Sequence, residues 1–152
     1  MITIGFRASP KAVTFAIYDT EKSLIVNVET IKVPLALDTP EALKYIRNTV
    51  LDILREYNVQ MGGLRITESA ALTTNLERIQ FEAVIQEAFA SSSLQRYFAG
   101  QIANITSRVG IERTDFKKYT AENYAYTRIN DWLGYKKEER EAIITALGAI
   151  NA

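Results

Sequence analysis

The chain has 152 residues, 18 basic and 18 acidic side chains, and neither histidine nor cysteine. This length favours a single domain over residues 1–152, which can bury a sizeable apolar core without any disulfide. The missing residue types exclude histidine-based triads, thiol nucleophiles and redox pairs, and they make a zinc site a poor match. Any chemistry must therefore use carboxylates with hard cations, or lysine, tyrosine, serine and arginine side chains.

The net charge of zero argues against a protein that coats nucleic acid or anionic membranes through its overall field. A local basic patch remains compatible with that balance. The longest apolar run, over 142–150, is far shorter than the roughly 20 residues that cross a bilayer. The first residues also lack the charged segment and long apolar core of a signal peptide. We therefore expect a cytoplasmic protein with no membrane partner.

Alternating apolar and polar residues predict three strands in the first third of the chain, over 1–8, 12–19 and 23–34. The breaks between them have the length of hairpin turns. These three strands are therefore expected to pair antiparallel.

The middle of the chain predicts a helix over 38–57, a strand over 64–69 and a helix over 74–90. Pro40 in the first turn and apolar residues at helical spacing favour the first helix. Gly62 and Gly63 are typical of a turn that introduces the strand, and Thr74 with Glu77 matches a capping box. The apolar stripe of the second helix is wide, which suits either a buried helix between neighbours or a homodimer contact.

The last third predicts a fifth strand over 101–108, because side chains there alternate, and three helices near 112–118, 121–133 and 137–150. Hairpin-length connections early and helix-length connections later indicate an α/β fold. The expected architecture is a mixed five-stranded sheet, three strands antiparallel and two parallel, with helices on both faces.

Four segments carry a resemblance to a known family: an opening strand with a central glycine, a strand ending in an acid, a strand leading to a short helix, and a final helix with two acids three residues apart. They are residues 2–9, 64–68, 104–113 and 137–143. Together with the element order, they resemble the ribonuclease H-like superfamily, most closely RuvC-type Holliday junction resolvases and small bacterial families of that architecture. The resemblance implies a single RuvC-like domain.

In such nucleases, three or four carboxylates hold two Mg²⁺ ions that drive phosphodiester hydrolysis. By resemblance, Glu68 matches the strand acid, and Glu138 and Glu141 match the helix pair. The first strand departs from the pattern, because Arg7 stands where the family has aspartate. A guanidinium cannot bind Mg²⁺, so we expect a degenerate site without a cofactor, in which Arg7 neutralises Glu68.

The same residues also have ordinary structural explanations. Glu68 can be a solvated acid at a strand end, and acids at the start of the last helix complement its dipole. Arg113, Lys117 and Lys118 lie among aromatic residues, a mixture that suits nucleic-acid contact by stacking and charge. Those aromatic residues can equally well pack a helix.

Three functional hypotheses follow from these patterns. The first is a catalytically degenerate domain that binds DNA or RNA or acts as a scaffold. The second is an active Mg²⁺-dependent nuclease that uses Glu68, Glu138 and Glu141. The third is a structural homo-oligomer, such as a homodimer, without a nucleic-acid role.

Overall fold

The sheet contains five strands: β1 (Ile2–Ser9), β2 (Ala12–Asp19), β3 (Leu24–Lys32), β4 (Met61–Arg65) and β5 (Arg96–Gly100). In the computed structural model, which describes residues 1–152, their order across the sheet is β3-β2-β1-β4-β5. The first three strands pair antiparallel, and β4 and β5 continue the sheet as parallel strands beside β1. The predicted mixed sheet is therefore confirmed.

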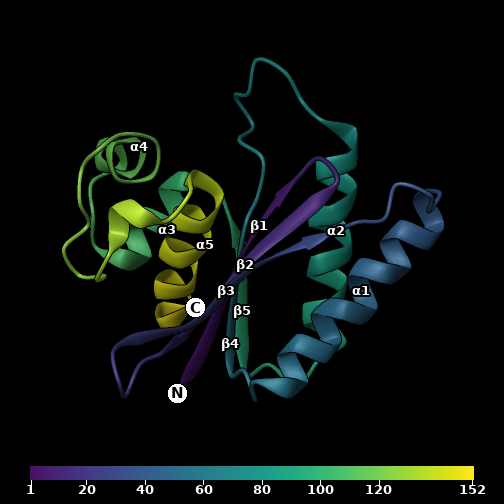
Figure 1. Cartoon of the computed structure of the whole chain (residues 1–152), viewed down its shortest axis with the longest axis horizontal. Helices are drawn as coiled ribbons and strands as arrows, with labels where there is room; N and C mark the ends of the chain where they lie inside the picture. Colours follow the sequence, from purple (N-terminus) through teal and green to yellow (C-terminus); the bar gives the residue numbers. More distant parts are fainter.

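Five α-helices cover the sheet: α1 (Thr39–Glu56), α2 (Leu76–Ala90), α3 (Ile102–Val109), α4 (Arg113–Ala121) and α5 (Lys137–Gly148). Short 3₁₀ turns lie before and after α5, at Trp132–Gly134 and Ala149–Asn151. The helices α1 and α2 lie on one side of the sheet, and α3, α4 and α5 lie on the other (Figure 1). Helices on both faces were predicted and are observed. None of them is both long and apolar enough to span a membrane.

The two-residue period of β1 sends its side chains alternately to the two helical layers. Ile4 and Phe6 are fully buried in the core beneath α1 and α2. The intervening residues face α5, where the Thr3 hydroxyl donates a hydrogen bond to the carbonyl oxygen of Ala146 (2.8 Å). The central strand therefore contacts both helical layers.

Gly5 allows α5 to approach the sheet at backbone distance. A Cβ at this position would lie 2.1 Å from the Ala142 carbonyl oxygen and 2.3 Å from the Ala146 nitrogen. Any other residue would push the helix away from β1. This close approach sets α5 over the ends of the central strands, where the candidate site lies.

The predicted strand over 101–108 is wrong, because these residues form α3 and the fifth strand comes earlier. Ile102, Ile105 and Val109 alternate poorly but match helical spacing, and they place one face of α3 against α5. The Asn104 side chain caps the helix by accepting a hydrogen bond from the Gln101 amide (2.9 Å). Isoleucine and threonine favoured a strand by propensity, but tertiary packing decides the helix here.

The strand β4 begins and ends earlier than the predicted range of 64–69. Gly62 and Gly63 lie inside the strand rather than in a turn. A Cβ on Gly62 would lie 2.9 Å from Leu94, and one on Gly63 would lie 2.7 Å from Phe98. Glycine therefore occupies these two positions because large side chains from neighbouring segments cover the strand there and leave no room for a Cβ.

The helix predicted over 121–133 is also wrong. The helix predicted near 112–118 is instead longer, since α4 reaches Ala121, and the chain then runs irregularly to the turn at Trp132–Gly134. Buried Tyr126 and Trp132 anchor this segment with their rings 5.5 Å apart. Aromatic anchors at unequal spacing hold an irregular loop as well as a helix, so composition alone misled the assignment.

The caps of the two long helices show where local sequence signals succeed. The Asp38 carboxylate accepts a hydrogen bond from the Glu41 amide (3.1 Å), as expected for the start of α1. In α2, Asn75 rather than Thr74 is the capping residue, with its oxygen 2.9 Å from the Arg78 nitrogen. The predicted helix is thus correct and its cap lies one residue later.

Candidate functional site

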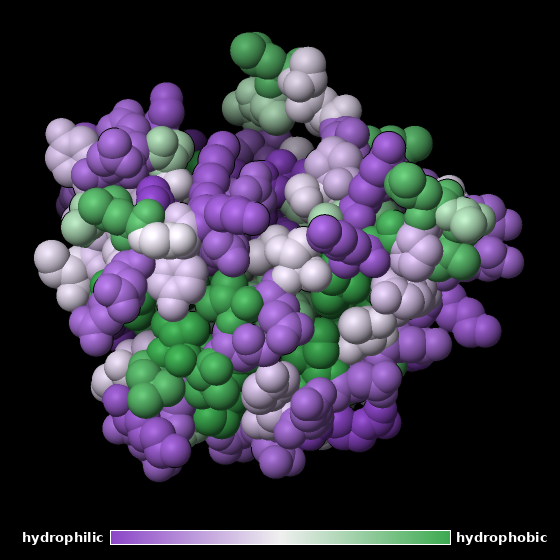
Figure 2. All heavy atoms as spheres, viewed as in Figure 1, coloured by the Kyte–Doolittle hydropathy of each residue, from purple (hydrophilic) through white to green (hydrophobic).

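A cleft of about 860 Å³ opens at the carboxyl ends of β1 and β4. The loop over 66–75, the first turn of α2 and the starts of α3, α4 and α5 complete its walls. Hydrophilic side chains gather around the recess beside this loop (Figure 2). The carboxyl ends of strands are where open α/β sheets bind ligands. Its charged lining comprises Arg7, Arg65, Arg78, Arg113, Lys137, Glu68, Glu138 and Glu141.

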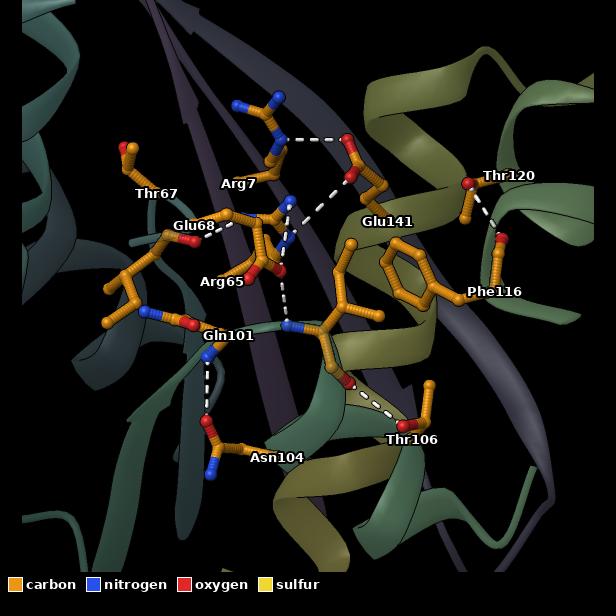
Figure 3. Close-up of polar contacts among 12 residues, drawn as sticks. Arg7, Arg65, Thr67, Glu68, Gln101, Asn104, Thr106, Phe116, Thr120 and Glu141 are labelled. Carbon is orange, nitrogen blue, oxygen red and sulfur yellow. Dashed lines mark hydrogen bonds and ion pairs between the residues drawn. The ribbon is translucent and has the colours of Figure 1, made fainter. Parts of the chain in front are cut away.

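Two arginines lie side by side at the base of the cleft. Arg7 and Arg65 are register partners on the parallel strands β1 and β4. Glu141 on α5 reaches both: its Oε2 accepts from Arg7 Nε at 2.7 Å, and its Oε1 lies 3.7 Å from Arg65 Nε (Figure 3). The three side chains are only 11%, 7% and 3% exposed. They form a nearly buried arginine–glutamate cluster.

The predicted pairing of Arg7 with Glu68 is wrong, because the partner of Arg7 is Glu141. Glu68 lies in the loop three residues beyond β4, where its carboxylate accepts a hydrogen bond from the Ile102 amide (2.8 Å) at the start of α3. Its contact with Arg65 is longer, at 3.8 Å. The earlier end of β4 puts Arg65, not Glu68, beside Arg7 on the sheet.

Glu138 and Glu139 open α5 in different ways. Glu138 is half-buried and lines the cleft, one turn before Glu141. Glu139 accepts a hydrogen bond from the Lys136 amide (2.7 Å), so it caps the helix. The helix-start explanation therefore applies to Glu139, whereas Glu138 and Glu141 face the cleft.

The three acids suggested by resemblance thus share one cleft without forming a metal cage. No group of three or more carboxylates is arranged to hold a metal ion. Glu141 is engaged by Arg7 and Arg65, and Glu68 by a backbone amide. A cation bound among them would lie beside two guanidinium charges. This donor set does not fit Mg²⁺.

A second ion pair, which the sequence interpretation missed, borders the cleft on α2. The Glu82 carboxylate is 6% exposed and accepts hydrogen bonds from the Thr67 amide (2.7 Å), the Thr67 hydroxyl (2.8 Å) and Arg78 Nε (2.9 Å). It thereby holds both the loop after β4 and the Arg78 guanidinium. The available signal was an acid within the apolar stripe of α2, four residues after an arginine.

Burial and mutual repulsion perturb the arginines of the cleft. Burial lowers the pKa of Arg65, an effect that Glu141 opposes and the charge of Arg7 reinforces. The pKa of Arg78 is lowered by burial first and by the charge of Arg7 second. Arginine nevertheless stays protonated in proteins. The cleft therefore concentrates permanent positive charge in a chain whose net charge is zero.

The predicted nucleic-acid contacts divide between two surfaces. Arg113, the first residue of α4, lines the cleft. Lys117 and Lys118 are exposed on α4 and do not line it. The Lys118 ammonium lies 3.8 Å from Asp115 and 5.6 Å from the ring centre of Tyr124. The structure therefore brings only Arg113 to the candidate site.

Most of the aromatic residues between α4 and α5 have a packing role. The rings of Tyr119 and Tyr126 lie 5.0 Å apart. The buried Trp132 donates a hydrogen bond from its indole nitrogen to the carbonyl oxygen of Tyr119 (2.8 Å). Tyr124 is the exposed exception. The core-packing explanation therefore holds for this group, and single-strand stacking is not needed to explain it.

No protein-family model matches the chain, and no curated protein is similar to it in sequence. Solved structures are similar in fold. Thermus thermophilus RuvC superposes with a TM-score of 0.71 at 10% identity, over 97% of this chain and 92% of that one. The T. thermophilus RuvC complex with a Holliday junction substrate gives a TM-score of 0.69 at 10% identity, over 97% and 91%.

A yeast mitochondrial Holliday junction resolvase is also similar, with a TM-score of 0.54 at 11% identity over 97% of this chain and 76% of that one. Identities this low establish the fold and not the activity. The strand order, the two helical layers and these similarities agree with one another. The chain has a RuvC-like, ribonuclease H-like fold.

Proposed function

We propose that the chain binds nucleic acid through the cleft and does not cleave it by a metal-dependent mechanism. The observation that carries this proposal is the pair Arg7 and Arg65 at matching positions of β1 and β4, with Glu141 between them. By resemblance, Arg7 stands where the family's nucleases have an aspartate, and Arg65 lies beside it on β4. Guanidinium groups bind phosphate oxygens directly and need no metal.

The charge of the cleft supports a polyanionic ligand. Five cationic side chains and three carboxylates line it, in a chain whose overall charge is zero. A cleft lined by an excess of one sign raises the local concentration of the opposite charge. Because one similar structure is a complex with a Holliday junction, branched DNA is the first ligand to test.

A second candidate is a nuclease that uses Glu68, Glu138 and Glu141, since the fold places all three at one cleft. Against it stands the 2.7 Å hydrogen bond from Arg7 to Glu141. A metal ion would have to displace that guanidinium and then tolerate its charge nearby. We therefore rank binding without cleavage first.

The test is a binding titration with a fluorescent four-way junction, a duplex and a single strand of matched sequence, in chelator. We expect binding of the junction that weakens steeply with salt. Arg113→Met should weaken it, because Arg113 lines the cleft. The matched control is Arg47→Met, which removes an exposed arginine of α1 whose partner is Glu87, outside the cleft.

Cleavage assays with Mg²⁺ or Mn²⁺ separate the remaining hypotheses. Cleavage that Glu68→Gln abolishes would overturn the proposal in favour of the nuclease. Failure to bind any of the three DNAs or the matching RNAs at low salt would leave the structural homo-oligomer, which sedimentation can then examine. Binding without cleavage is the expected result.

A further inference from the structure

We propose that the cleft contains a subsite for one phosphate group, held by Arg65 and Arg78 beside Arg7. The subsite takes an oxyanion in a region where the fold's nucleases need cations. This inference rests on the proposed function and deepens it, since it names the chemical group of the nucleic acid that the cleft binds. The experiments below can refute the phosphate subsite and the nucleic-acid binding function separately.

The first observation is a pair of buried donors without acceptors. Arg65 Nε and Arg78 Nη2 are both buried and donate no hydrogen bond. The Arg65 side chain is 7% exposed, and its Nε lies 3.7 Å from Glu141, too far for a hydrogen bond. Buried unpaired donors are rare and costly in native proteins. Both arginine side chains line the cleft, so their guanidinium groups adjoin the space that an acceptor would enter.

The second observation is that the guanidinium groups of Arg78, Arg7 and Arg65 are each held by an acceptor of the protein. Glu82 accepts a hydrogen bond from Arg78 Nε at 2.9 Å, and Glu141 accepts one from Arg7 Nε at 2.7 Å. The Arg65 guanidinium also donates to the carbonyl oxygen of Ile66. Each side chain is thus held before a ligand arrives, which lowers the entropic cost of binding. The planar guanidinium matches the geometry of phosphate oxygens.

The third observation is the local charge balance. The cationic lining of the cleft has five members, and its three lining acids together with Glu82 supply four negative charges. One positive charge is therefore in excess. Positive charges of Arg7 and Arg65 also act on Arg78, so the three arginines repel one another. An anion among them relieves that repulsion.

The charge excess favours one source of phosphate over another. A backbone phosphodiester carries a single negative charge, which equals the excess that remains when Glu82 is counted with the three lining acids. Inorganic phosphate or a terminal phosphate ester carries up to two at neutral pH. We therefore assign the subsite to a backbone phosphodiester and use inorganic phosphate as the probe for the competing source.

The key variant is Arg78→Met, because Arg78 is 16% exposed at the rim and contributes one of the two unpaired donors. The matched control is Arg47→Met, which removes an equal charge outside the cleft. Arg78→Lys keeps the charge near Glu82 but lacks the second donor. The Arg78→Lys variant therefore tests the contact made by the second donor of Arg78, even if Arg78→Met folds poorly.

Affinity for the fluorescent four-way junction is measured in chelator at several salt concentrations. We expect Arg78→Met to weaken binding about tenfold or more and to lower the salt slope by about one contact. Arg78→Lys should recover the salt slope but only part of the affinity. Arg47→Met should match the wild type. If the wild type binds the junction and the Arg78 variants bind it with the same affinity, the subsite is refuted. The proposed function then survives.

The second arm measures the melting temperature in inorganic phosphate against chloride at equal ionic strength. A backbone source predicts a small rise in the wild type that Arg78→Met removes. A second outcome is that phosphate raises the melting temperature by several degrees, that Arg78→Met removes this rise, and that no DNA or RNA binds. In that case the subsite is a site for free phosphate, and the proposed function is overturned. The subsite is overturned if inorganic phosphate leaves the melting temperature unchanged and the Arg78 variants leave nucleic-acid binding unchanged.

Discussion

The two faces of the central sheet are held by different means. Beneath α1 and α2, large apolar side chains fill the space, and the ring centres of Phe6 and Phe89 lie 5.8 Å apart. Beneath α5, Gly5 brings backbones into contact, and Arg7 and Glu141 are buried as charges. Close backbone packing and buried ion pairs both tolerate little change. The α5 face of the sheet, which also borders the cleft, should therefore tolerate fewer substitutions than the opposite face.

One ion pair from each side of the sheet makes the contrast sharper. The N–O distance is 2.7 Å for Arg7–Glu141 and 2.6 Å for Arg47–Glu87. The first pair is 11% and 3% exposed, whereas the second is 37% and 52% exposed. Geometry is nearly the same, so burial decides what each pair does for stability. Removing one partner of a buried pair leaves the other charge buried and uncompensated, which is costly. Removing one partner of an exposed pair leaves a charge that water solvates, so the cost is small.

The largest expected effect is on the backbone contact of the α5 face. Gly5→Val should destabilise by about 5 kcal/mol or more, a large part of a domain's total stability, because its Cβ collides with the α5 backbone. Urea unfolding followed by circular dichroism measures this. The control is Gly134→Ala, where a Cβ would have no neighbour within 4 Å and stability should stay the same. A folded Gly5→Val protein of normal stability would show that α5 does not approach β1 so closely.

The next largest effect concerns the buried charge that balances two arginines. Glu141→Gln keeps the shape of the side chain but removes the anion between Arg7 and Arg65. It should cost about 3–5 kcal/mol in the free energy of unfolding. The double variant Glu141→Gln with Arg7→Met should recover part of that loss. A cost below about 1 kcal/mol for Glu141→Gln would mean that water reaches this cluster.

The exposed pair on the opposite side should matter much less. Arg47→Met should shift the melting temperature by about 2 °C at most. Hydrogen bonds from Arg47 and then Ser91 lower the pKa of Glu87. Its stabilising contribution is therefore present above the ordinary carboxyl pKa and is lost as the pH falls through the lowered value. Arg47→Met and wild-type protein should converge in stability in acid, and a difference that persists there contradicts this assignment.

The smallest expected effect is that of divalent cations on the unmodified protein. Millimolar Mg²⁺ or Mn²⁺ should leave the melting temperature unchanged, because guanidinium groups adjoin the acids of the cleft. The double variant Arg7→Asp with Arg65→Glu should be unstable in chelator and gain several degrees with metal. A metal-dependent rise in the wild type that Glu68→Gln abolishes would restore the case for a nuclease.

Much of the fold is readable from local patterns. The two-residue period of the first three strands and the helical period of α1, α2 and α5 depend on residues close in sequence. The failures have a common cause. Residues 101–108 form a helix whose apolar face packs against α5, and the side chains of Leu94 and Phe98 cover the glycines of β4. Local propensity is too weak to decide such segments.

The candidate site divides in the same way. The absence of histidine and cysteine chemistry, the neutral net charge and the arginine at position 7 can all be read from the amino-acid sequence. The folded chain was needed to find that Arg7 meets Glu141, 134 positions away, and that Arg65 rather than Glu68 stands beside it. Strand register and the approach of α5 set these contacts. Both arise from packing between distant segments, which no local pattern encodes.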